Sequence, residues 1–238
     1  MKIYAHRGAS HDYPEMTMAA YENAVKQGAD GFECDLRLTK DGIAVLWHDA
    51  DLKRRANNDA VVADSNYLQL KGIYPQILTL DQFFDFAIVE KKSLLLETKH
   101  PVPSRTAIED LLVKKIHLEA KRIEKAGITA NIMSFSWFAI ERVKALDKNI
   151  ETTFLLHEQT PWFSARYSSA QSLGPGISLL RKKPALAKRI KETGRKLNVW
   201  TVDDPSDIKL CQKLGIDILI TNRPGFAREL LHNSSTSL

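Results

Sequence analysis

The stretch from residue 33 to residue 49 constrains the fold of this chain more than any other segment. In its first half, Glu33, Asp35 and Arg37 alternate with hydrophobic residues. A repeat of two is the period of a β-strand, because successive side chains of a strand point to opposite faces. The stretch therefore predicts a strand with one hydrophobic face and one charged face.

The middle of the same stretch predicts a β-hairpin. Asp41-Gly42 is a strong signal for a two-residue turn, because such a turn needs positive φ at both central residues. The hydrophobic residues 43–47 would form the returning strand. With a two-residue turn, Asp35 lies directly opposite His48 on the same face of the hairpin. The hairpin would thus place carboxylates and an imidazole side by side.

Composition is typical of a globular enzyme. The chain has 238 residues, of which 44% are hydrophobic, enough for one large core. The net charge of +5 suits a small anionic substrate. The basic segments 181–183 and 188–196 are interpreted as solvated helix faces, so no nucleic-acid partner is expected. Cys34 and Cys211 have no metal or redox spacing. Without a signal peptide or a run long enough for stable membrane insertion, we expect a cytoplasmic protein.

The order of the predicted elements indicates the fold class. Leaving out the returning hairpin strand, eight strands alternate with helices and begin at Lys2, Ala29, Ser93, Ala130, Glu151, Gly176, Leu197 and Ile216. Eight parallel strands with helical crossovers predict a closed (β/α)8 TIM barrel, in a single domain spanning residues 1–238. Residues 49–79 are expected to form an inserted cap, and residues 232–238 a polar tail. A doubly wound open sheet is the alternative, but the Gly-rich phosphate loop that it would need is absent.

Acidic residues lie toward the ends of the predicted strands. Glu33, Asp35 and Glu97 should converge, because the C-terminal ends of barrel strands face one mouth. Three carboxylates in one cavity repel each other unless a cation binds them, and oxygen ligands suit Mg²⁺ or Ca²⁺ rather than zinc. The alternative is that these carboxylates form salt bridges with nearby basic residues, which are Arg7, Arg37 and Lys99.

Other residues at the same mouth indicate what the site would bind. Arg7 and Lys99, beside a metal ion, suit a phosphate group. His6 and His48 could act as general base and general acid, because the pKa of histidine lies near working pH. Trp200 could pack against the carbon skeleton of a substrate, and a role as core filler is the equal alternative.

Together these residues resemble the glycerophosphodiester phosphodiesterase family, which is related to the phosphatidylinositol-specific phospholipase C barrels. The resemblance covers nearly the whole chain, and the order and spacing of its motifs make it specific. The motifs are His6-Arg7-Gly8, Pro14-Glu15-x-Thr17, Glu33-x-Asp35, Thr39-x-Asp41-Gly42, His48-Asp49-x-x-Leu52-x-Arg54, Glu97-x-Lys99, Ser134-Phe135, Val199-Trp200-Thr201-Val202 and Gly215-Ile216-Asp217-x-x-Ile220-Thr221.

The resemblance implies a barrel with a small insertion and metal-dependent hydrolysis of glycerophosphodiesters, such as glycerophosphocholine or glycerophosphoethanolamine. The products would be an alcohol and sn-glycerol 3-phosphate. By position in the motifs, the metal ligands would be Glu33, Asp35 and Glu97, and the acid–base pair would be His6 and His48. The phosphate-binding residues would be Arg7 and Lys99, and Glu15 would be a supporting residue near the metal.

Three positions depart from the family pattern. Met16 replaces a usual Asn, Asn222 replaces a common Asp, and Arg55-Ala56 replaces two threonines. None is expected to touch the presumed ligands or histidines, so the activity should be retained. Two alternative functions stay open: a related phosphodiesterase acting on lysophospholipids or glycerophosphoinositol, and a barrel that binds phosphate esters without turnover. The preferred alcohol, the choice between Mg²⁺ and Ca²⁺ and the oligomeric state also stay open.

Overall fold

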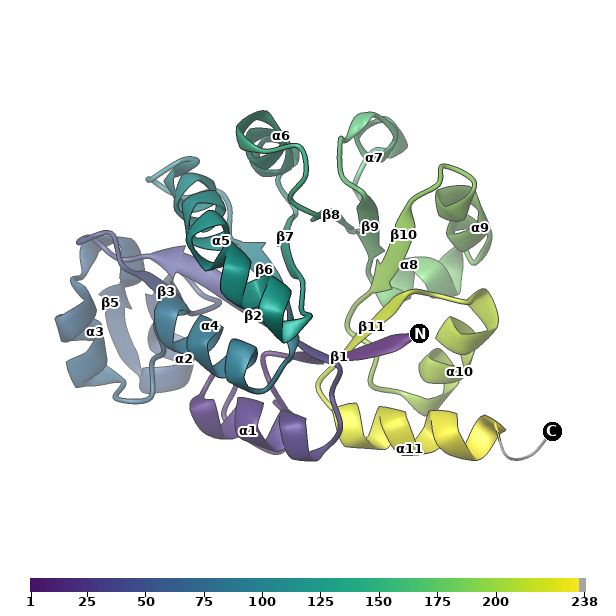
Figure 1. The fold of residues 1–238 in the computed structure, drawn as a ribbon, viewed down its shortest axis with the longest axis horizontal. Helices are drawn as coiled ribbons and strands as arrows, with labels where there is room; N and C mark the ends of the chain where they lie inside the picture. Colours follow the sequence, from purple (N-terminus) through teal and green to yellow (C-terminus); the bar gives the residue numbers. More distant parts are fainter. Residues whose placement is uncertain (236–238) are drawn as a thin grey trace.

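Eight parallel strands close into a barrel in the computed structural model, which describes residues 1–235 (Figure 1). Each strand pairs with the next around the ring, and β1 pairs with both β11 and β2, which closes it. The predicted TIM barrel is confirmed. The barrel strands are β1 (Lys2–His6), β2 (Gly31–Leu38), β6 (Ser93–Thr98), β7 (Ala130–Ser134), β8 (Thr152–Leu156), β9 (Ser172–Pro175), β10 (Lys196–Val199) and β11 (Ile218–Thr221).

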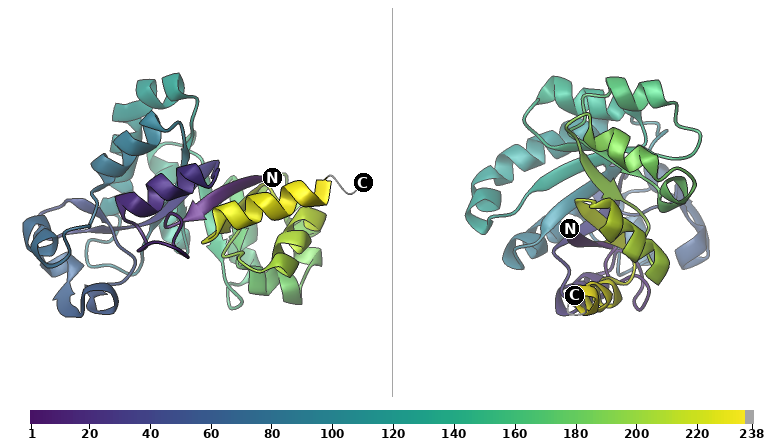
Figure 2. Two further views of the ribbon diagram at one scale, coloured as in Figure 1. Left: turned by 90° about the horizontal axis from the view of Figure 1, so that it is seen from below. Right: turned by 90° about the vertical axis from the view of Figure 1, so that its right-hand side faces the viewer.

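Helices surround this barrel, and Figure 2 shows the last of them, α11, beside the first strand β1. α11 also meets the end of α1, where Gly225 N donates to Gln27 Oε1 at 3.3 Å. No helix within residues 1–235 is long and apolar enough to cross a membrane. The helices are α1 (Met18–Lys26), α4 (Leu80–Val89), α5 (Ala107–Ala126), α6 (Trp137–Leu146), α7 (Trp162–Tyr167), α8 (Ile177–Lys182), α9 (Ala185–Lys191), α10 (Pro205–Leu214) and α11 (Pro224–Ser235).

Two predictions about chain segments need correction. The strand predicted to begin at Gly176 is instead β9, which ends at Pro175, and the residues after Gly176 form α8. A short apolar run fits a strand or a helix equally well by periodicity, which explains the error. The predicted polar tail of residues 232–238 is helical as far as Ser235, and residues 236–238 lie outside the described part of the chain.

The predicted hairpin is present, but its predicted register is wrong. β3 (Ala44–Leu46) pairs antiparallel with β2, one residue away from the expected alignment. The connecting loop is one residue longer than a two-residue turn and ends in Gly42 at φ +77°. As a result, Trp47 N donates to Asp35 O at 3.0 Å, and His48 follows after the pairing has ended.

Residues 49–79 form several short elements beside the hairpin, on the left in Figure 1. They have a hydrophobic cluster of their own with β3, whose buried members are Val45, Trp47, Leu52, Val62, Leu70 and Ile77. Burial of these side chains holds the segment against the hairpin. Its elements are β4 (Asp51–Leu52), α2 (Lys53–Ala56), β5 (Asn58–Val61), a 3₁₀ turn η1 (Val62–Asp64) and α3 (Tyr67–Ile73).

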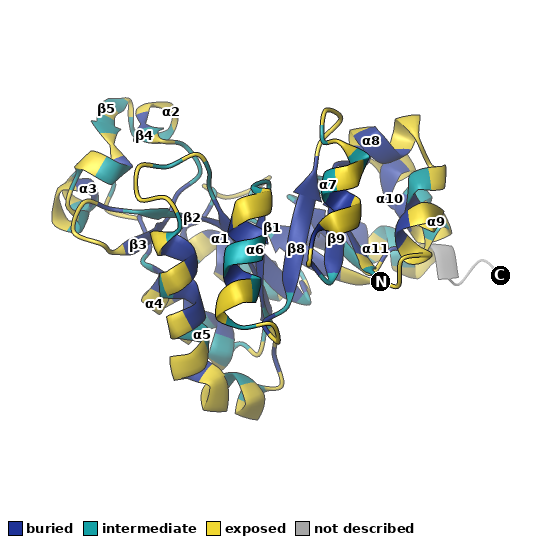
Figure 3. Ribbon diagram, turned by 90° about the horizontal axis from the view of Figure 1, so that it is seen from above, coloured by how far each residue is buried: buried dark blue, intermediate teal, exposed yellow. Residues whose placement is uncertain are grey.

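Side-chain alternation along the strands determines what faces the inside of the barrel. The strands are buried at the centre of the molecule (Figure 3), and the interior holds an apolar layer of Tyr4, Leu95, Met133, Leu155 and Ile220. Nearer the C-terminal ends of β1, β2 and β6, the inward positions are charged or polar. Strand pairing places His6 beside Glu33 and Asp35 beside Glu97, so each pair points the same way.

Candidate active site

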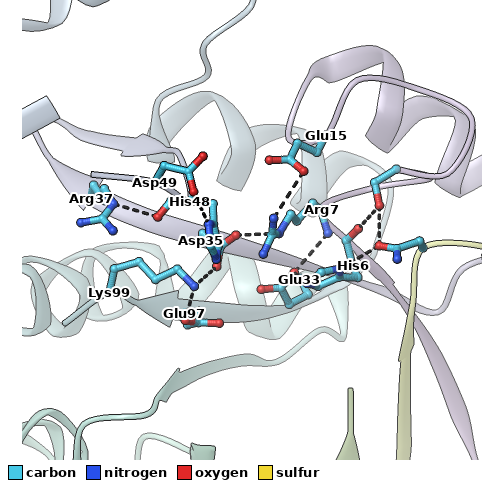
Figure 4. Close-up of polar contacts among 12 residues, drawn as sticks. His6, Arg7, Glu15, Glu33, Asp35, Arg37, His48, Asp49, Glu97 and Lys99 are labelled. Carbon is cyan, nitrogen blue, oxygen red and sulfur yellow. Dashed lines mark hydrogen bonds and ion pairs between the residues drawn. The ribbon is translucent and has the colours of Figure 1, made fainter. Parts of the chain in front are cut away.

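Three buried carboxylates form the centre of the site, two on β2 and one near the C-terminal end of β6. One oxygen of each of Glu33, Asp35 and Glu97 lies within 4.8 Å of the other two. The predicted convergence is therefore present, and Figure 4 shows the three side chains together. Carboxylate oxygens at this spacing are compatible with one divalent cation.

Two basic side chains neutralise part of this carboxylate charge. Arg7 Nε lies 2.8 Å from Asp35 Oδ2. Lys99 Nζ lies 2.7 Å from Asp35 Oδ1 and 2.5 Å from Glu97 Oε1 (Figure 4). Arg37 takes no such position, because its Nε donates to the backbone oxygen of His48 at 2.9 Å. Salt bridges thus compensate the charge of Asp35, but the three carboxylates have only two basic side chains, Arg7 and Lys99, beside them.

The pKa values show which carboxylates lack compensation. Burial by itself would raise the pKa of Asp35, but Lys99 and Arg7 outweigh it and lower that pKa to about 2. Burial, followed by the charge of Asp35, raises the pKa of Glu97 to about 7. The same two causes raise the pKa of Glu33 well above its ordinary value. In the absence of a further cation, Glu33 and Glu97 therefore keep their protons to higher pH than an ordinary glutamate does.

The donor set at Glu33 fits a divalent cation. Glu33 Oε2 accepts a hydrogen bond from Arg7 N at 3.1 Å, whereas the buried Oε1 has no hydrogen-bond partner among residues 1–235. A buried carboxylate oxygen without a partner is unfavourable. A cation there would satisfy this oxygen and lower the pKa of both glutamates, Glu33 and Glu97.

His6 is held as a neutral imidazole with one free nitrogen. Its Nδ1 lies 2.7 Å from Asn222 Oδ1, which also accepts from Ser10 Oγ at 2.7 Å. Because this oxygen can only accept, the network assigns the proton to Nδ1. The lone pair of Nε2 then faces Glu33 Oε2 at 3.8 Å. Burial and then the charge of Arg7 lower the pKa of His6 to about 4, so His6 is neutral at pH 7.

His48 lies on the Asp35 side of the carboxylates, away from His6 (Figure 4). Its Nδ1 is 2.7 Å from Asp49 Oδ1, and its side chain is 35% exposed. Burial lowers the pKa of His48 and outweighs Asp35, which would raise it.

An unusual backbone bend directs Arg7 into the site. Arg7 has φ +59° and Met16 has φ +56°, and Met16 N donates to Arg7 O at 2.8 Å. Residues other than glycine rarely adopt such angles, and Asn does so more readily than Met. Met16, which stands where the family usually has Asn, therefore strains the backbone beside the site. Glu15, predicted as a supporting residue, accepts from Arg7 Nη1 at 3.3 Å.

A hollow of about 220 Å³ opens at the mouth beside the carboxylates, lined by Arg37, His48, Glu97, Thr98, Lys99, His100 and Phe135. Trp200 is not among the lining residues. Its Nε1 donates to Gly174 O at 2.7 Å, and its ring packs edge-on against Phe135 with centroids 5.2 Å apart. Trp200 therefore supports the wall of the hollow through Phe135.

The sequence reasoning missed the residues that hold the two histidines. Asn222 was not expected to touch a histidine, yet it contacts His6 directly. Asp203 orients Asn222 by accepting from its Nδ2 at 2.6 Å and its N at 2.8 Å. Arg54 Nε lies 2.6 Å from the Asp49 carboxylate that contacts His48. Both Asn222 and Arg54 carried a usable signal. Asn222 directly follows the last predicted strand and so lies at the mouth, and Arg54 stands in the motif that begins at His48.

Comparisons with known proteins agree with this geometry. A sequence model of the glycerophosphoryl diester phosphodiesterase family matches residues 6–226. A probable glycerophosphodiester phosphodiesterase 1 of Mycobacterium tuberculosis is 31% identical, over 97% of this chain and 92% of its own length. A glycerophosphodiester phosphodiesterase of Caldanaerobacter subterraneus is 32% identical, over 93% of this chain and 94% of its own.

Solved structures share the fold. A glycerophosphodiester phosphodiesterase of Thermotoga maritima superposes with a TM-score of 0.80 at 24% identity, covering 97% of this chain and 98% of its own. An Oleispira antarctica phosphodiesterase in complex with the product sn-glycerol-3-phosphate superposes with a TM-score of 0.81 at 24% identity, covering 98% and 97%. With the sequence matches, these findings show that the chain belongs to the glycerophosphoryl diester phosphodiesterase family of enzymes.

Proposed function

We propose that this chain hydrolyses glycerophosphodiesters to an alcohol and sn-glycerol 3-phosphate, with a divalent cation bound by Glu33, Asp35 and Glu97. Membership of the family supports the phosphodiesterase activity. The observation that carries the proposal is the buried carboxylate triad of Glu33, Asp35 and Glu97, whose three acidic groups outnumber the two neighbouring basic side chains. Two basic residues at the same point suit the phosphate group of such an ester.

Mg²⁺ or Ca²⁺ suits this site because all three donors are carboxylate oxygens. When bound, the cation supplies positive charge that stabilises the negative charge developing on the phosphoryl oxygens. Burial and the charge of Asp35 raise the pKa values of Glu33 and Glu97. The positive charge of the cation would lower both pKa values, so both glutamates would then be ionised.

Arg7 and Lys99 would bind the phosphate of the substrate. Arg7 uses Nε toward Asp35 and Nη1 toward Glu15, which leaves further N–H groups of its guanidinium for an anion. Lys99 contacts Asp35 and Glu97 and has a third N–H. The Oleispira antarctica structure holds sn-glycerol-3-phosphate, which supports a small anionic ester as the substrate of this chain as well.

His6 and His48 would divide the proton transfers. His6 Nε2, unprotonated in the assigned tautomer, takes the proton of the nucleophile as this attacks phosphorus, the nucleophile being water or the adjacent glycerol hydroxyl. The bond from phosphorus to the alcohol oxygen breaks, and His48 gives this oxygen a proton. Attack by water gives sn-glycerol 3-phosphate directly, whereas attack by the glycerol hydroxyl gives a cyclic phosphate that one water molecule then opens to the same product. Asp49 accepts from His48 Nδ1, and a bound phosphate diester adds negative charge that favours the protonated imidazole.

A pocket beside the mouth favours lysophospholipids as a second candidate class of substrate. It has about 470 Å³, shares His100 and Phe135 with the mouth hollow, and has apolar walls that include Val102 and Phe138. An acyl chain would lie there, since burial of its methylene groups is favourable. Phe138→Ser should then reduce turnover of lysophosphatidylcholine relative to glycerophosphocholine, whereas Phe163→Ser, an exposed aromatic outside the pocket, should not.

We also propose a cytoplasmic location, because Cys34 and Cys211 are both buried free thiols. Unpaired thiols are typical of proteins from reducing compartments.

The test of the proposed function is coupled detection of glycerol 3-phosphate from a panel of glycerophosphodiesters, with and without chelator. We expect release that chelation abolishes and that Mg²⁺ or Ca²⁺ restores. Full activity after exhaustive chelation would contradict the cation site, and release from none of the esters would contradict the proposed substrate class.

A further inference from the structure

We infer that Arg54 is a positioning residue that holds both sides of the active site from the inserted segment. Arg54 lies in α2, outside the barrel. Its guanidinium contacts two carboxylates: Nη2 is 2.5 Å from Glu15 Oε1, and Nε is 2.6 Å from Asp49 Oδ2. The inference rests on the proposed function, because its consequence depends on the roles given there to Arg7 and His48.

Each of the two carboxylates uses its second oxygen toward the site. Glu15 Oε2 lies 3.3 Å from Arg7 Nη1, and Asp49 Oδ1 lies 2.7 Å from His48 Nδ1. The guanidinium of Arg54 therefore reaches the phosphate-binding Arg7 through Glu15, and the acid His48 through Asp49. Arg54 thereby connects the turn after β1, which carries Arg7, to the segment after the hairpin, which carries His48.

The geometry of arginine suits this task. A guanidinium is planar and presents its N–H groups at fixed angles, so binding through Nε and Nη2 sets the separation of the Glu15 and Asp49 carboxylates. Without Arg54, Glu15 would keep only its contact with Arg7, and Asp49 only its contact with His48. Each carboxylate could then rotate away from that partner. A lysine in its place has a single ammonium and would hold the pair less rigidly.

The fold itself should not depend on Arg54. Its side chain is 46% exposed, and ion pairs at such positions contribute little to stability. The neighbouring residue offers a matched control. Lys53 pairs with Asp59 at 2.9 Å, both side chains are more than half exposed, and neither contacts a residue of the site. Replacing Lys53 removes the same charge from the same short helix.

The experiment compares Arg54→Gln, Arg54→Lys and Lys53→Gln in the full chain with saturating cation. The substrates are glycerophosphocholine, whose leaving alkoxide needs a proton, and a p-nitrophenyl ester of glycerol phosphate, whose leaving group does not. We expect Arg54→Gln to raise KM for both esters through Arg7, and to lower kcat mainly for glycerophosphocholine through His48. The loss in kcat/KM on glycerophosphocholine should be roughly 10- to 100-fold, as for other outer-shell partners. Arg54→Lys should recover part of it, and Lys53→Gln should match wild type.

A double variant separates the two contacts. In an Asp49→Asn background, Arg54→Gln should change KM but cause little further loss of kcat. The inference is overturned if Arg54→Gln equals Lys53→Gln, or if it lowers kcat equally on both esters with unchanged KM and a lower melting temperature. A wild-type chain that hydrolyses neither ester contradicts the proposed function and this inference with it. An active wild type with an unaffected Arg54→Gln variant contradicts the inference alone.

Discussion

The two ends of the barrel are both hollow, but only one of them concentrates buried acidic groups. The cavity at the N-terminal ends of the strands has about 810 Å³, several times the 220 Å³ of the mouth hollow. Its buried polar lining is neutral and includes Asn131, Ser172 and Asn198. Two of the charged residues at its rim form ion pairs: Lys196 and Arg228 each lie 2.7 Å from a carboxylate, those of Glu151 and Asp30 respectively.

The difference teaches that volume does not mark the active site of this barrel. At the base, which is the N-terminal end of the barrel, Thr153 Oγ1 donates to Asn131 Oδ1 at 2.9 Å and accepts from Asn198 Nδ2 at 3.0 Å, so these three side chains are linked by hydrogen bonds without charge. At the mouth, the pKa of Asp35 falls to about 2 while that of Glu97 rises to about 7. Opposed pKa shifts in one cluster are typical of sites that bind ions or move protons.

The largest effect that would sharpen this comparison is expected at the triad. Glu33→Gln and Glu97→Gln should each lower kcat/KM by about a thousandfold or more, because charge stabilisation by a bound cation contributes several kcal/mol. The measurement is glycerol 3-phosphate release from glycerophosphocholine, with circular dichroism to confirm the fold. Near-normal activity in either variant would show that the mouth needs no cation.

The next largest effect on the rate is expected from replacing the two histidines. His6→Ala and His48→Ala should each reduce the rate on glycerophosphocholine by roughly 10²- to 10⁴-fold. On a p-nitrophenyl ester, whose leaving group departs unaided, His48→Ala should recover much of its loss and His6→Ala should not. Equal defects on both esters would remove the assignment of acid and base, and selective recovery of His6→Ala would reverse it.

A smaller effect concerns stability against pH in the cation-free protein. The pKa of Glu97 is raised to about 7 chiefly by burial, from its ordinary value of 4.5, so its contribution to stability is fully present below pH 4.5 and is lost as pH rises through about 7. The contribution of Glu97 to the free energy of unfolding should fall over this window by at most about 3 kcal/mol. Asp35, with its pKa lowered to about 2 by Lys99 and Arg7 against the effect of burial, acts only below this window.

Urea unfolding with chelator at both ends of this pH window would measure that fall. The Glu97→Gln variant, which cannot ionise at this position, should show less of it. A wild-type protein whose stability does not fall as the pH rises would show that Glu97 is compensated without a cation.

The smallest effect is expected at the base. Ser172 is buried there, and its Oγ has no hydrogen-bond partner among residues 1–235. Because the base lacks a charged cluster and lies at the far end of the barrel, Ser172→Ala should leave kcat and KM on glycerophosphocholine unchanged. A substantial loss of activity in this variant would break the distinction between the two ends.

Much of this arrangement could be predicted from residue patterns. The alternation in β2 placed Glu33 and Asp35 on one face, and the succession of strands and helices predicted a barrel whose strand ends converge. The strand register that pairs His6 with Glu33 then follows from the barrel fold itself. The triad is therefore a consequence of local pattern and topology together.

The remaining features depend on contacts that no local pattern encodes. A loop one residue longer than the Asp41-Gly42 turn shifted the hairpin register, so His48 reaches the site by leaving the sheet rather than by pairing with Asp35. The contact between His6 and Asn222 joins residues 216 positions apart. The lowered pKa of His48 reflects burial, which outweighs the nearby Asp35. Burial is a property of the whole fold.

Calorimetric titration of Mg²⁺ or Ca²⁺ into the chelator-stripped protein tests the central claim most directly. At about pH 6, below the raised pKa of Glu97, cation binding should displace protons from the glutamates, so the heat should depend on the ionisation enthalpy of the buffer. We predict one binding event with net proton release for wild type, and loss of binding in Glu33→Gln. No binding heat, or binding without proton release that persists in Glu33→Gln, would contradict the account.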